Sequence, residues 1–314
     1  MSRIIITGGT GLIGRALAFE LAAAENEVII LSRHASGAYN LPQSARVHAW
    51  DAKTAEGWSA LASGAAAIVN LAGESIAPMP WTAERRRRIL QSRVDAGRAV
   101  VEAVRAAEVK PRVVIQASAV GYYGLCGDEQ VTEETPPGDD FLAHVCRDWE
   151  ESSAPLEQLG VRRVIIRTGL VLSRDGGVFP LIAMPFRFFV GGRIGNGRQY
   201  TPWIHIVDHA RAICFLIGKA TANGPLNLTA PNPVTNAEFS RALGETMGRP
   251  ALIPTPGFAL RLVFGDMAKL MLLGGQRAVP KHLQEMGFQF RFPDLQSALS
   301  DLLRPAKESA LPTQ

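Results

Sequence analysis

Three glycines near the start of the chain have the spacing of a dinucleotide-binding turn. Gly8, Gly11 and Gly14 follow the apolar run 3–7, and the residues after them repeat apolar side chains at helical spacing. In such a turn one glycine permits the tight bend, one lets the backbone approach a pyrophosphate, and one lets the helix pack on the strand. The free N–H groups at the helix start would bind phosphate oxygens. The alternative is a purely structural turn of an α/β domain.

The end of the next apolar run, 27–31, bears on the choice of nucleotide. Ser32 and Arg33 stand where an acidic residue would hydrogen-bond the free 2′-hydroxyl of NAD. A guanidinium can instead pair with a 2′-phosphate. We therefore predict NADP(H) in preference to NAD(H), the alternative being that Arg33 is a solvated loop residue.

Two further apolar runs end in residues that could line the same ligand. Asp51 follows the run 46–50 and could face the adenine, while small residues after the run 67–71 would let the cofactor pass close to the sheet. Glu74 is either a contact at the nicotinamide end or a surface carboxylate. The full set of expected cofactor-binding residues is Gly8, Thr10, Gly11, Leu12, Ile13, Gly14, Ser32, Arg33, Asp51, Leu71, Ala72, Gly73, Glu74, Arg93 and Val171.

These residues need a parallel sheet to bring them to one edge. Apolar runs at 112–117, 164–167 and 225–228 continue the series, and the segment 82–108 has the apolar periodicity of a long helix. Within that helix Arg93 could reach the pyrophosphate, whereas the arginines at 85–88 are expected to form a solvated face. The stretch 176–190 contains two prolines and predicts a broken helix over the substrate cleft. We predict an α/β fold, a Rossmann-type doubly wound parallel sheet with a smaller C-terminal substrate lobe.

Several motifs together resemble one known superfamily. They are Thr7–Gly14, Ser32–Arg33, Asn70–Glu74, Ser92–Arg93, Ser118–Gly124, Arg167–Gly169 and Trp203–Asp208. The chain resembles the extended short-chain dehydrogenases/reductases, and more closely their atypical "epimerase family" proteins, which are nucleoside-diphosphate-sugar epimerase-like. The tail 280–303 is similar to that family's short C-terminal domain, so the resemblance covers nearly the whole chain. It implies an NADP-binding domain over 1–225, in which 170–205 contribute to the substrate cleft, and a lobe over 226–308 that includes a family-specific segment at 255–303.

The chain departs from this superfamily at its catalytic pair. Members typically carry Tyr-x-x-x-Lys one helix after the serine, but Phe141 and Val145 fall at those positions, and no tyrosine is followed by lysine four residues on. Phenylalanine cannot donate a proton and valine cannot lower a pKa. The expected acids are therefore Ser118, which matches the family serine, Tyr122 and Tyr123, unless the tyrosines only pack the cleft wall. The chain is then either an NADP-dependent oxidoreductase or epimerase-like enzyme with a non-standard acid, or a non-catalytic NADP(H)-binding or sensing protein.

Bulk composition limits the kinds of partner and the cellular compartment that we expect. The net charge of +4 on 314 residues is too small to indicate a nucleic-acid partner, and three cysteines without CxxC spacing favour a reducing compartment. No apolar stretch is long enough to span a membrane, so we expect a cytoplasmic monomer or homodimer with an unknown small-molecule substrate and no membrane partner. His205, Asp208 and His209 are expected at a helix entry, with no metal bound. Residues 309–314 are expected to form a loose tail.

Overall fold

Seven parallel strands form the central sheet of the computed structural model, which describes residues 1–37, 39–76 and 81–304. The expected tail at 309–314 lies outside these residues. The strand order is β11-β7-β5-β4-β1-β2-β3, and every neighbouring pair is parallel. The strands are β1 (Arg3–Thr7), β2 (Glu27–Ser32), β3 (Arg46–Ala49), β4 (Ala67–Asn70), β5 (Val113–Ala119), β7 (Arg162–Thr168) and β11 (Gly224–Leu228). The predicted doubly wound sheet is confirmed.

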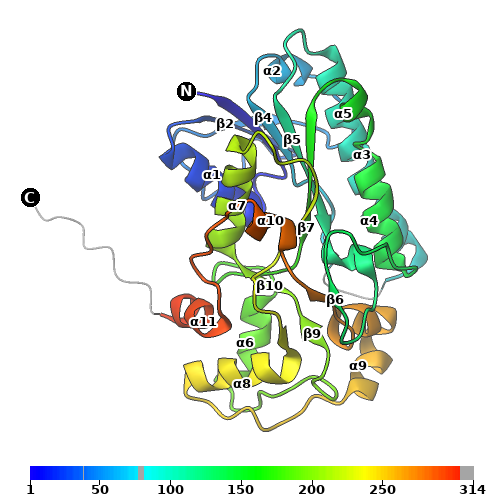
Figure 1. Ribbon diagram of the computed structural model, residues 1–314, viewed down its shortest axis with the longest axis vertical. Helices are drawn as coiled ribbons and strands as arrows, with labels where there is room; N and C mark the ends of the chain where they lie inside the picture. Colours follow the sequence, from blue (N-terminus) through cyan, green and yellow to red (C-terminus); the bar gives the residue numbers. More distant parts are fainter. Residues whose placement is uncertain (38, 77–80, 305–314) are drawn as a thin grey trace, which may run out of the picture.

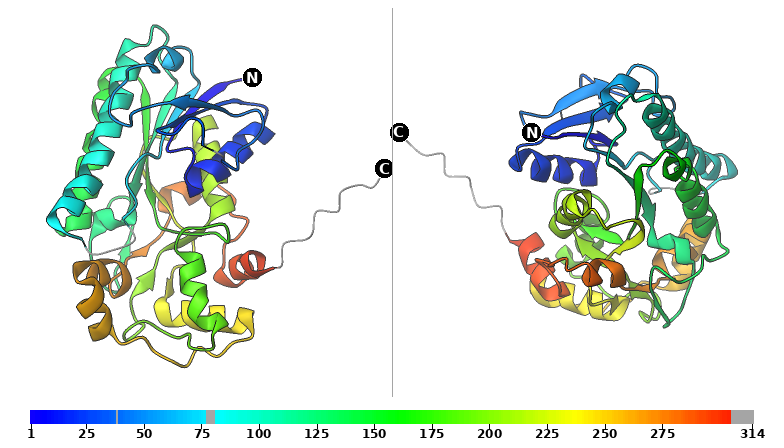
Figure 2. Two further views of the ribbon diagram at one scale, coloured as in Figure 1. Left: turned by 180° about the vertical axis from the view of Figure 1, so that it is seen from behind. Right: turned by 45° about the horizontal axis from the view of Figure 1, so that its top comes forward.

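Helices cover both faces of this sheet (Figure 2). On one face lie α1 (Leu12–Ala23), α7 (Ile206–Gly218) and α10 (Lys281–Glu285); on the other lie α2 (Ser59–Ala62), α3 (Ala83–Ala106), α4 (Phe141–Glu151) and α5 (Pro155–Gln158). Side chains on β1 alternate between the two layers, because successive residues of a strand point to opposite faces. Ile4 and Ile6 pack with α1 and α7, whereas Ile5 packs with α3.

A smaller lobe lies beyond one end of the sheet, in the lower half of Figure 1. It contains β8 (Leu170–Leu172), α6 (Phe179–Arg187), β9 (Tyr200–Thr201), β10 (Trp203–His205), β12 (Val234–Thr235), α8 (Asn236–Met247), α9 (Gly257–Phe264), the π-helix η2 (Ala268–Leu272) and α11 (Leu295–Leu303). Its core is aromatic and includes Phe179, Trp203 and Phe239. The broken helix expected over 176–190 is instead the single helix α6. Pro185 lies in its last turns, where the missing N–H costs only one intrahelical hydrogen bond.

The C-terminal segment ties the lobe to the sheet. After β13 (Arg277–Ala278) pairs with β6 (Gln130–Val131), Leu283 and Phe288 enter the core of the large domain and Leu299 enters that of the lobe. The tail is therefore docked on both parts of the molecule by buried apolar side chains. The expected boundary at residues 225 and 226 falls inside β11, which belongs to the large sheet.

Candidate functional site

A buried row of polar side chains aligns three strands at the carboxyl edge of the sheet. The Thr7 hydroxyl donates to Asn70 Oδ1 at 2.6 Å, and Asn70 Nδ2 donates to Gln116 Oε1 at 2.9 Å. The Ala72 N–H donates to the Thr7 hydroxyl at 3.2 Å, so the turn after β4 is held beside the turn after β1. This row was not predicted from the sequence. The sequence feature that could have indicated it is one polar residue near the carboxyl end of each of three otherwise apolar strands.

The glycine turn between β1 and α1 lies at this edge, and two of its glycines are required by packing. Gly8 has a φ of +65°, and a Cβ there would lie 2.9 Å from the Leu71 carbonyl carbon and oxygen. A Cβ on Gly14 would lie 2.5 Å from Gly9 Cα. At Gly11 the nearest atom beyond its two chain neighbours would be the Gly8 carbonyl oxygen at 3.2 Å, with no other such described atom within 4 Å. Gly11 therefore leaves open space in front of the turn.

The first turn of α1 has no cap. α3, α4, α8 and α11 have side-chain caps, supplied by Thr82, Asp140, Thr235 and Asp294, but the N-cap of α1 is Gly11 and its first turn contains no acidic residue. The leading N–H groups of a helix have no intrahelical acceptor. At the start of α1 no side chain caps these N–H groups, and the space in front of Gly11 is open. They therefore form a positively polarised binding site for an anion.

Leu12 and Val171 are brought together beside this binding site. A Cβ on Gly177 would lie 2.9 Å from Leu12 Cδ2 and 4.0 Å from the Val171 carbonyl oxygen. The segment after β8 therefore passes over the start of α1, which groups two of the expected cofactor-binding residues from distant parts of the chain.

The expected nucleotide-selecting residues lie at the end of β2. Ser32 is buried, and its hydroxyl oxygen accepts the His34 N–H at 3.2 Å. The Tyr39 hydroxyl donates to the His34 carbonyl at 2.8 Å and closes the same turn. Arg33 is exposed between these fixed neighbours, so its side chain is available to a ligand.

Asp51 forms a local turn. Its carboxylate accepts the N–H groups of Lys53 and Thr54 and the Thr54 hydroxyl, all within 2.9 Å. Slight burial raises the pKa of Asp51, but these hydrogen bonds outweigh that effect and hold the pKa below its ordinary value. Its oxygens are thus already bonded in the structure.

Glu74 and Arg93 both hold the segment after β4 against α3. The Glu74 carboxylate pairs with Arg85, and the backbone N–H of Glu74 donates to the Ser92 hydroxyl at 3.0 Å. Arg93 donates to the Glu74 carbonyl at 2.9 Å and lies with its guanidinium carbon 4.8 Å from the Trp149 ring centre. Burial lowers the pKa of Arg93 to about 10. In the structure both residues make protein contacts that position Gly73.

The run of arginines that opens α3 is only partly solvated. Arg87 and Arg88 are more than half exposed, as expected. The expectation is wrong for Arg85, which pairs with Glu74, and for Arg86, which donates to Asp266 at 2.5 Å. The sequence could not show this because both acidic partners lie outside the helix.

A second polar cluster lies beneath the end of β5, where the expected acids Ser118 and Tyr123 are both engaged. The Ser118 hydroxyl donates to Glu150 Oε1 at 2.6 Å, and the same carboxylate forms a two-pronged pair with Arg167 at 2.9 and 3.0 Å. The Tyr123 hydroxyl donates to Asn227 Oδ1 at 2.7 Å and accepts from Arg167 at 3.1 Å. All of these side chains are buried.

Burial and hydrogen bonding together shift the pKa values of Tyr123 and Arg167. Burial raises the pKa of Tyr123 to about 12. It also acts to lower the pKa of Arg167, but the hydrogen bonds and charge of Glu150 outweigh that effect and hold the pKa above its ordinary value. Ser118, Tyr123 and Arg167 were singled out from the sequence, but Glu150 was not. Its partners Ser118 and Arg167 lie on β5 and β7, far from it in the sequence.

Tyr122 differs from the other two expected acids. It is half-buried, and its hydroxyl makes no hydrogen bond with any described residue. Its ring centre lies 3.4 Å from the guanidinium carbon of Arg167, an orientation in which the cation faces the ring.

Phe141 and Val145, at the expected Tyr and Lys positions, belong to an apolar cluster. They pack with Trp81, Ile89 and Met267, and the Phe141 and Trp81 ring centres are 5.3 Å apart. Met267, just before η2, brings the C-terminal segment into this cluster.

Among the described residues, no three or more His, Cys, Asp or Glu side chains are grouped so that they could hold a metal ion. The His205 ring accepts the Val207 N–H at the start of α7, Asp208 accepts backbone N–H groups of the tail, and His209 lies 3.0 Å from the Thr168 hydroxyl. The expected helix-entry position is thus occupied by His205 as the N-cap, with Asp208 in the first turn.

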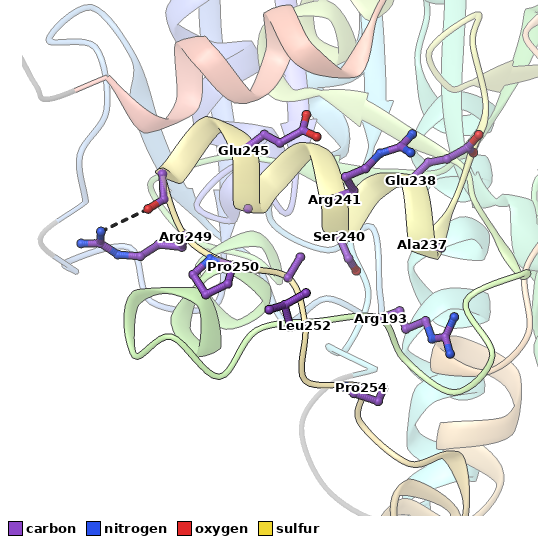
Figure 3. Close-up of a pocket in the computed structure, with 13 residues that line it drawn as sticks. Arg193, Ala237, Glu238, Ser240, Arg241, Glu245, Arg249, Pro250, Leu252 and Pro254 are labelled. Carbon is purple, nitrogen blue, oxygen red and sulfur yellow. Dashed lines mark hydrogen bonds between the residues drawn. The ribbon is translucent and has the colours of Figure 1, made fainter.

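A groove of about 790 Å³ lies elsewhere, in the small lobe between α8 and the segment 249–254 (Figure 3). None of the expected site residues lines it. Arg249 points away from Arg193 and Arg241, so these charges do not converge on one ligand group.

Comparison with known proteins identifies the class. The model of the NAD dependent epimerase/dehydratase family matches residues 4–228, and a domain of unknown function, DUF1731, matches residues 255–302. The first match covers more than half of the chain, so the protein belongs to the NAD dependent epimerase/dehydratase family.

Individual relatives match nearly the whole chain. The protein is 39% identical over 297 residues to the epimerase family protein ML0860 of Mycobacterium leprae, covering 95% of this chain and 94% of that one. It is 38% identical over 314 residues to YfhF of Bacillus subtilis, covering 97% and 99%. Among solved structures, the human epimerase family protein SDR39U1 (isoform 2) with NADPH matches with a TM-score of 0.86 and 33% identity, covering 96% of this chain and 98% of that one.

Proposed function

We propose that this protein is an NADP(H)-dependent oxidoreductase or epimerase-like enzyme whose proton donor is not the tyrosine of the usual tyrosine–lysine pair. The observation that carries the proposal is the uncapped start of α1 behind Gly11, at the carboxyl edge of the sheet. The chain's family binds a dinucleotide, and the human relative was solved with NADPH.

The residues present fit such a cofactor. The N–H groups of Leu12, Ile13 and Gly14 would hold the pyrophosphate, and Arg33 would pair with the 2′-phosphate. Gly73, held in place by Arg93, would let the ligand pass close to β4. When bound, the nicotinamide supplies or accepts a hydride.

Tyr122 is the acid that the geometry favours. The Ser118 proton is held by Glu150 and the Tyr123 proton by Asn227, so transfer from either would break a buried hydrogen bond. The Tyr122 hydroxyl has no such bond to a described residue, and it follows β5 at the edge where ligands bind in open α/β sheets. Without a lysine to assist it, a tyrosine is a slow proton donor at neutral pH, so we expect turnover of generic carbonyl compounds to be absent or very slow.

The second candidate is a non-catalytic NADP(H)-binding or sensing protein. The apolar packing of Phe141 and Val145 favours it, because no charged group at those positions could assist a tyrosine.

Denaturing the purified protein and identifying the released small molecules by mass spectrometry tests the proposal. We expect NADP(H), and any second compound becomes the trial substrate. On that substrate Tyr122→Phe should lose most of kcat while Tyr123→Phe, the matched control, retains NADPH affinity and a measurable rate. Binding of NADPH without turnover in the wild type would favour the sensing protein. No released nucleotide and no binding of added NADPH would contradict both.

A further inference from the structure

The helix α9 is an exposed apolar element. It contains no buried residue, and the exposed fractions of Phe258 and Leu262 are 77% and 86%. Leu252, on the segment that leads into it, is 81% exposed. From residue 252 to residue 265 the only charged residue is Arg261. A surface of this kind marks an interaction site more often than a solvated face.

The exposed apolar surface extends beyond the helix. The Ile253 N–H donates to the Gly191 carbonyl at 3.1 Å and the Thr255 N–H donates to the Arg193 carbonyl at 2.9 Å, so the segment 252–255 runs beside the segment 190–193. The large hydrophobic residues of 188–190, of 252–255 and of α9 that are at least half exposed form a surface that we call the apolar face: Phe188, Phe189, Val190, Leu252, Ile253, Phe258, Leu262 and Val263. α9 lies at the outer edge of the small lobe in both Figure 1 and Figure 2.

The chain segments that form the apolar face are basic. Segments 187–198 and 249–273 contain six basic residues and one acidic residue, a net charge of +5, whereas the whole chain carries +4. The one acidic residue, Asp266, already pairs with Arg86, and Arg198 lies 3.8 Å from Asp128. The basic residues are Arg187, Arg193, Arg198, Arg249, Arg261 and Lys269. The rest of the chain is close to neutral, so the charge excess of the protein is concentrated here.

We propose that the apolar face docks on an anionic membrane surface, which departs from the sequence-based expectation of no membrane partner. Exposed phenylalanine and leucine side chains flanked by basic residues are the pattern of an interfacial element, which inserts at the level of the lipid headgroups. Arg261 and Lys269 would contact the anionic headgroups. This is surface association: none of the described helices is long and apolar enough to cross a membrane.

The charge pattern favours this occupant over a second copy of the chain. In a two-fold dimer built on the same face, each copy would present the same basic residues to the other. Like charges brought together without counter-charges oppose association. An anionic lipid surface supplies the opposite charge to Arg261, on α9 itself, and to Lys269, which follows it.

Co-sedimentation of the full chain with vesicles tests the proposal. We expect binding to vesicles of phosphatidylcholine mixed with phosphatidylglycerol, little binding to phosphatidylcholine alone, and a loss of binding as salt is raised. Leu262→Asp should weaken binding about tenfold or more, since it removes an inserted side chain and adds a negative charge. Arg261→Gln should weaken it about fivefold.

Val109→Asp is the matched control, because Val109 is 63% exposed in a loop that lies outside the small lobe. It should bind anionic vesicles as the wild type does, and circular dichroism melting should show all variants folded. Equal sedimentation with both vesicle types, or none with either, would overturn the proposal. So would a wild-type dimer in analytical ultracentrifugation that Leu262→Asp converts to a monomer, since the face would then be an interface between copies.

Discussion

At the scale of single residues, the glycines of the β1–α1 turn divide into two kinds. Gly8 and Gly14 are required because backbone occupies the space where their Cβ atoms would lie. Gly11 faces open space and is required only if a ligand is bound there. From the pattern, one glycine is expected to approach a ligand and two to serve packing; the structure shows that Gly11 is the one that faces open space.

Substitution at these positions should separate the same two effects. Gly11→Val should abolish detectable NADPH binding while the melting temperature stays near that of the wild type, because its Cβ meets one carbonyl oxygen at 3.2 Å. Gly14→Val should instead destabilise the fold by at least about 1–3 kcal/mol, because its Cβ would overlap backbone atoms. Calorimetry and thermal melts measure both. Normal NADPH binding by Gly11→Val would mean that the phosphate site lies elsewhere.

The buried His209 makes a second prediction at this scale. Burial lowers its pKa to about 3, from 6.5 for an exposed histidine. Below pH 6.5 the unfolded chain therefore binds a proton that the native state does not, and the free energy of unfolding falls by up to about 1.4 kcal/mol per pH unit. This loss should occur as pH falls from about 6.5 toward 3 and should be absent above 7.

Urea denaturation at pH 7 and pH 5 checks this for the wild type and for His209→Gln, which cannot titrate. The variant should lose less stability between the two pH values than the wild type. An equal loss in both proteins would show that His209 does not contribute to the acid sensitivity.

At the scale of elements, the sequence predicted most of the central sheet within one or two residues. The run 67–71 became β4 (Ala67–Asn70), and the helix expected over 82–108 is α3 (Ala83–Ala106), which begins after the cap Thr82. The helix has a long apolar pattern and a clear capping residue, and the strand is a continuous apolar run, so both have a local signal. The two-residue strands β6 and β13 were not predicted, because their pairing joins residues 130–131 to residues 277–278 and leaves no local signal.

The attachment of the tail to α7 can be tested at one carboxylate. Asp208 accepts the N–H groups of Arg291 and Phe292, each at 2.8 Å, and pairs with Arg211 at 3.0 Å. Asp208→Asn removes one acceptor oxygen and leaves a buried N–H without a partner, so it should cost about 1–3 kcal/mol in the free energy of unfolding.

Arg211→Ala separates the tail contact from the ion pair. The Arg211 side chain is 37% exposed, whereas Asp208 is fully buried. Because the N–H groups of Arg291 and Phe292 still hold the carboxylate after Arg211→Ala, that variant should cost less than Asp208→Asn. Urea denaturation measures both variants. If Arg211→Ala costs as much as Asp208→Asn, the charge pair and not the tail contact is the source of the stability.

At the scale of the whole molecule, the candidate site could be predicted in part. Residues from local motifs, such as the β1–α1 glycines and Arg33, lie at the expected edge. The engagement of Ser118 by Glu150 and Arg167 could not be predicted, because it needs the relative positions of β5, α4 and β7. The same holds for Arg85 and Arg86, whose ion pairs depend on distant segments.

The central claim is that this arrangement binds NADP(H) through the turn after β1, with Arg33 on the 2′-phosphate. Titration calorimetry of NADPH and NADH against the wild type and Arg33→Ala tests it most directly. A charge-assisted contact of roughly 1.5–3 kcal/mol predicts about ten- to a hundredfold tighter binding of NADPH by the wild type. Arg33→Ala should remove most of that preference and leave NADH binding nearly unchanged. Equal affinities of the wild type for the two nucleotides, or no binding of either, would contradict the account.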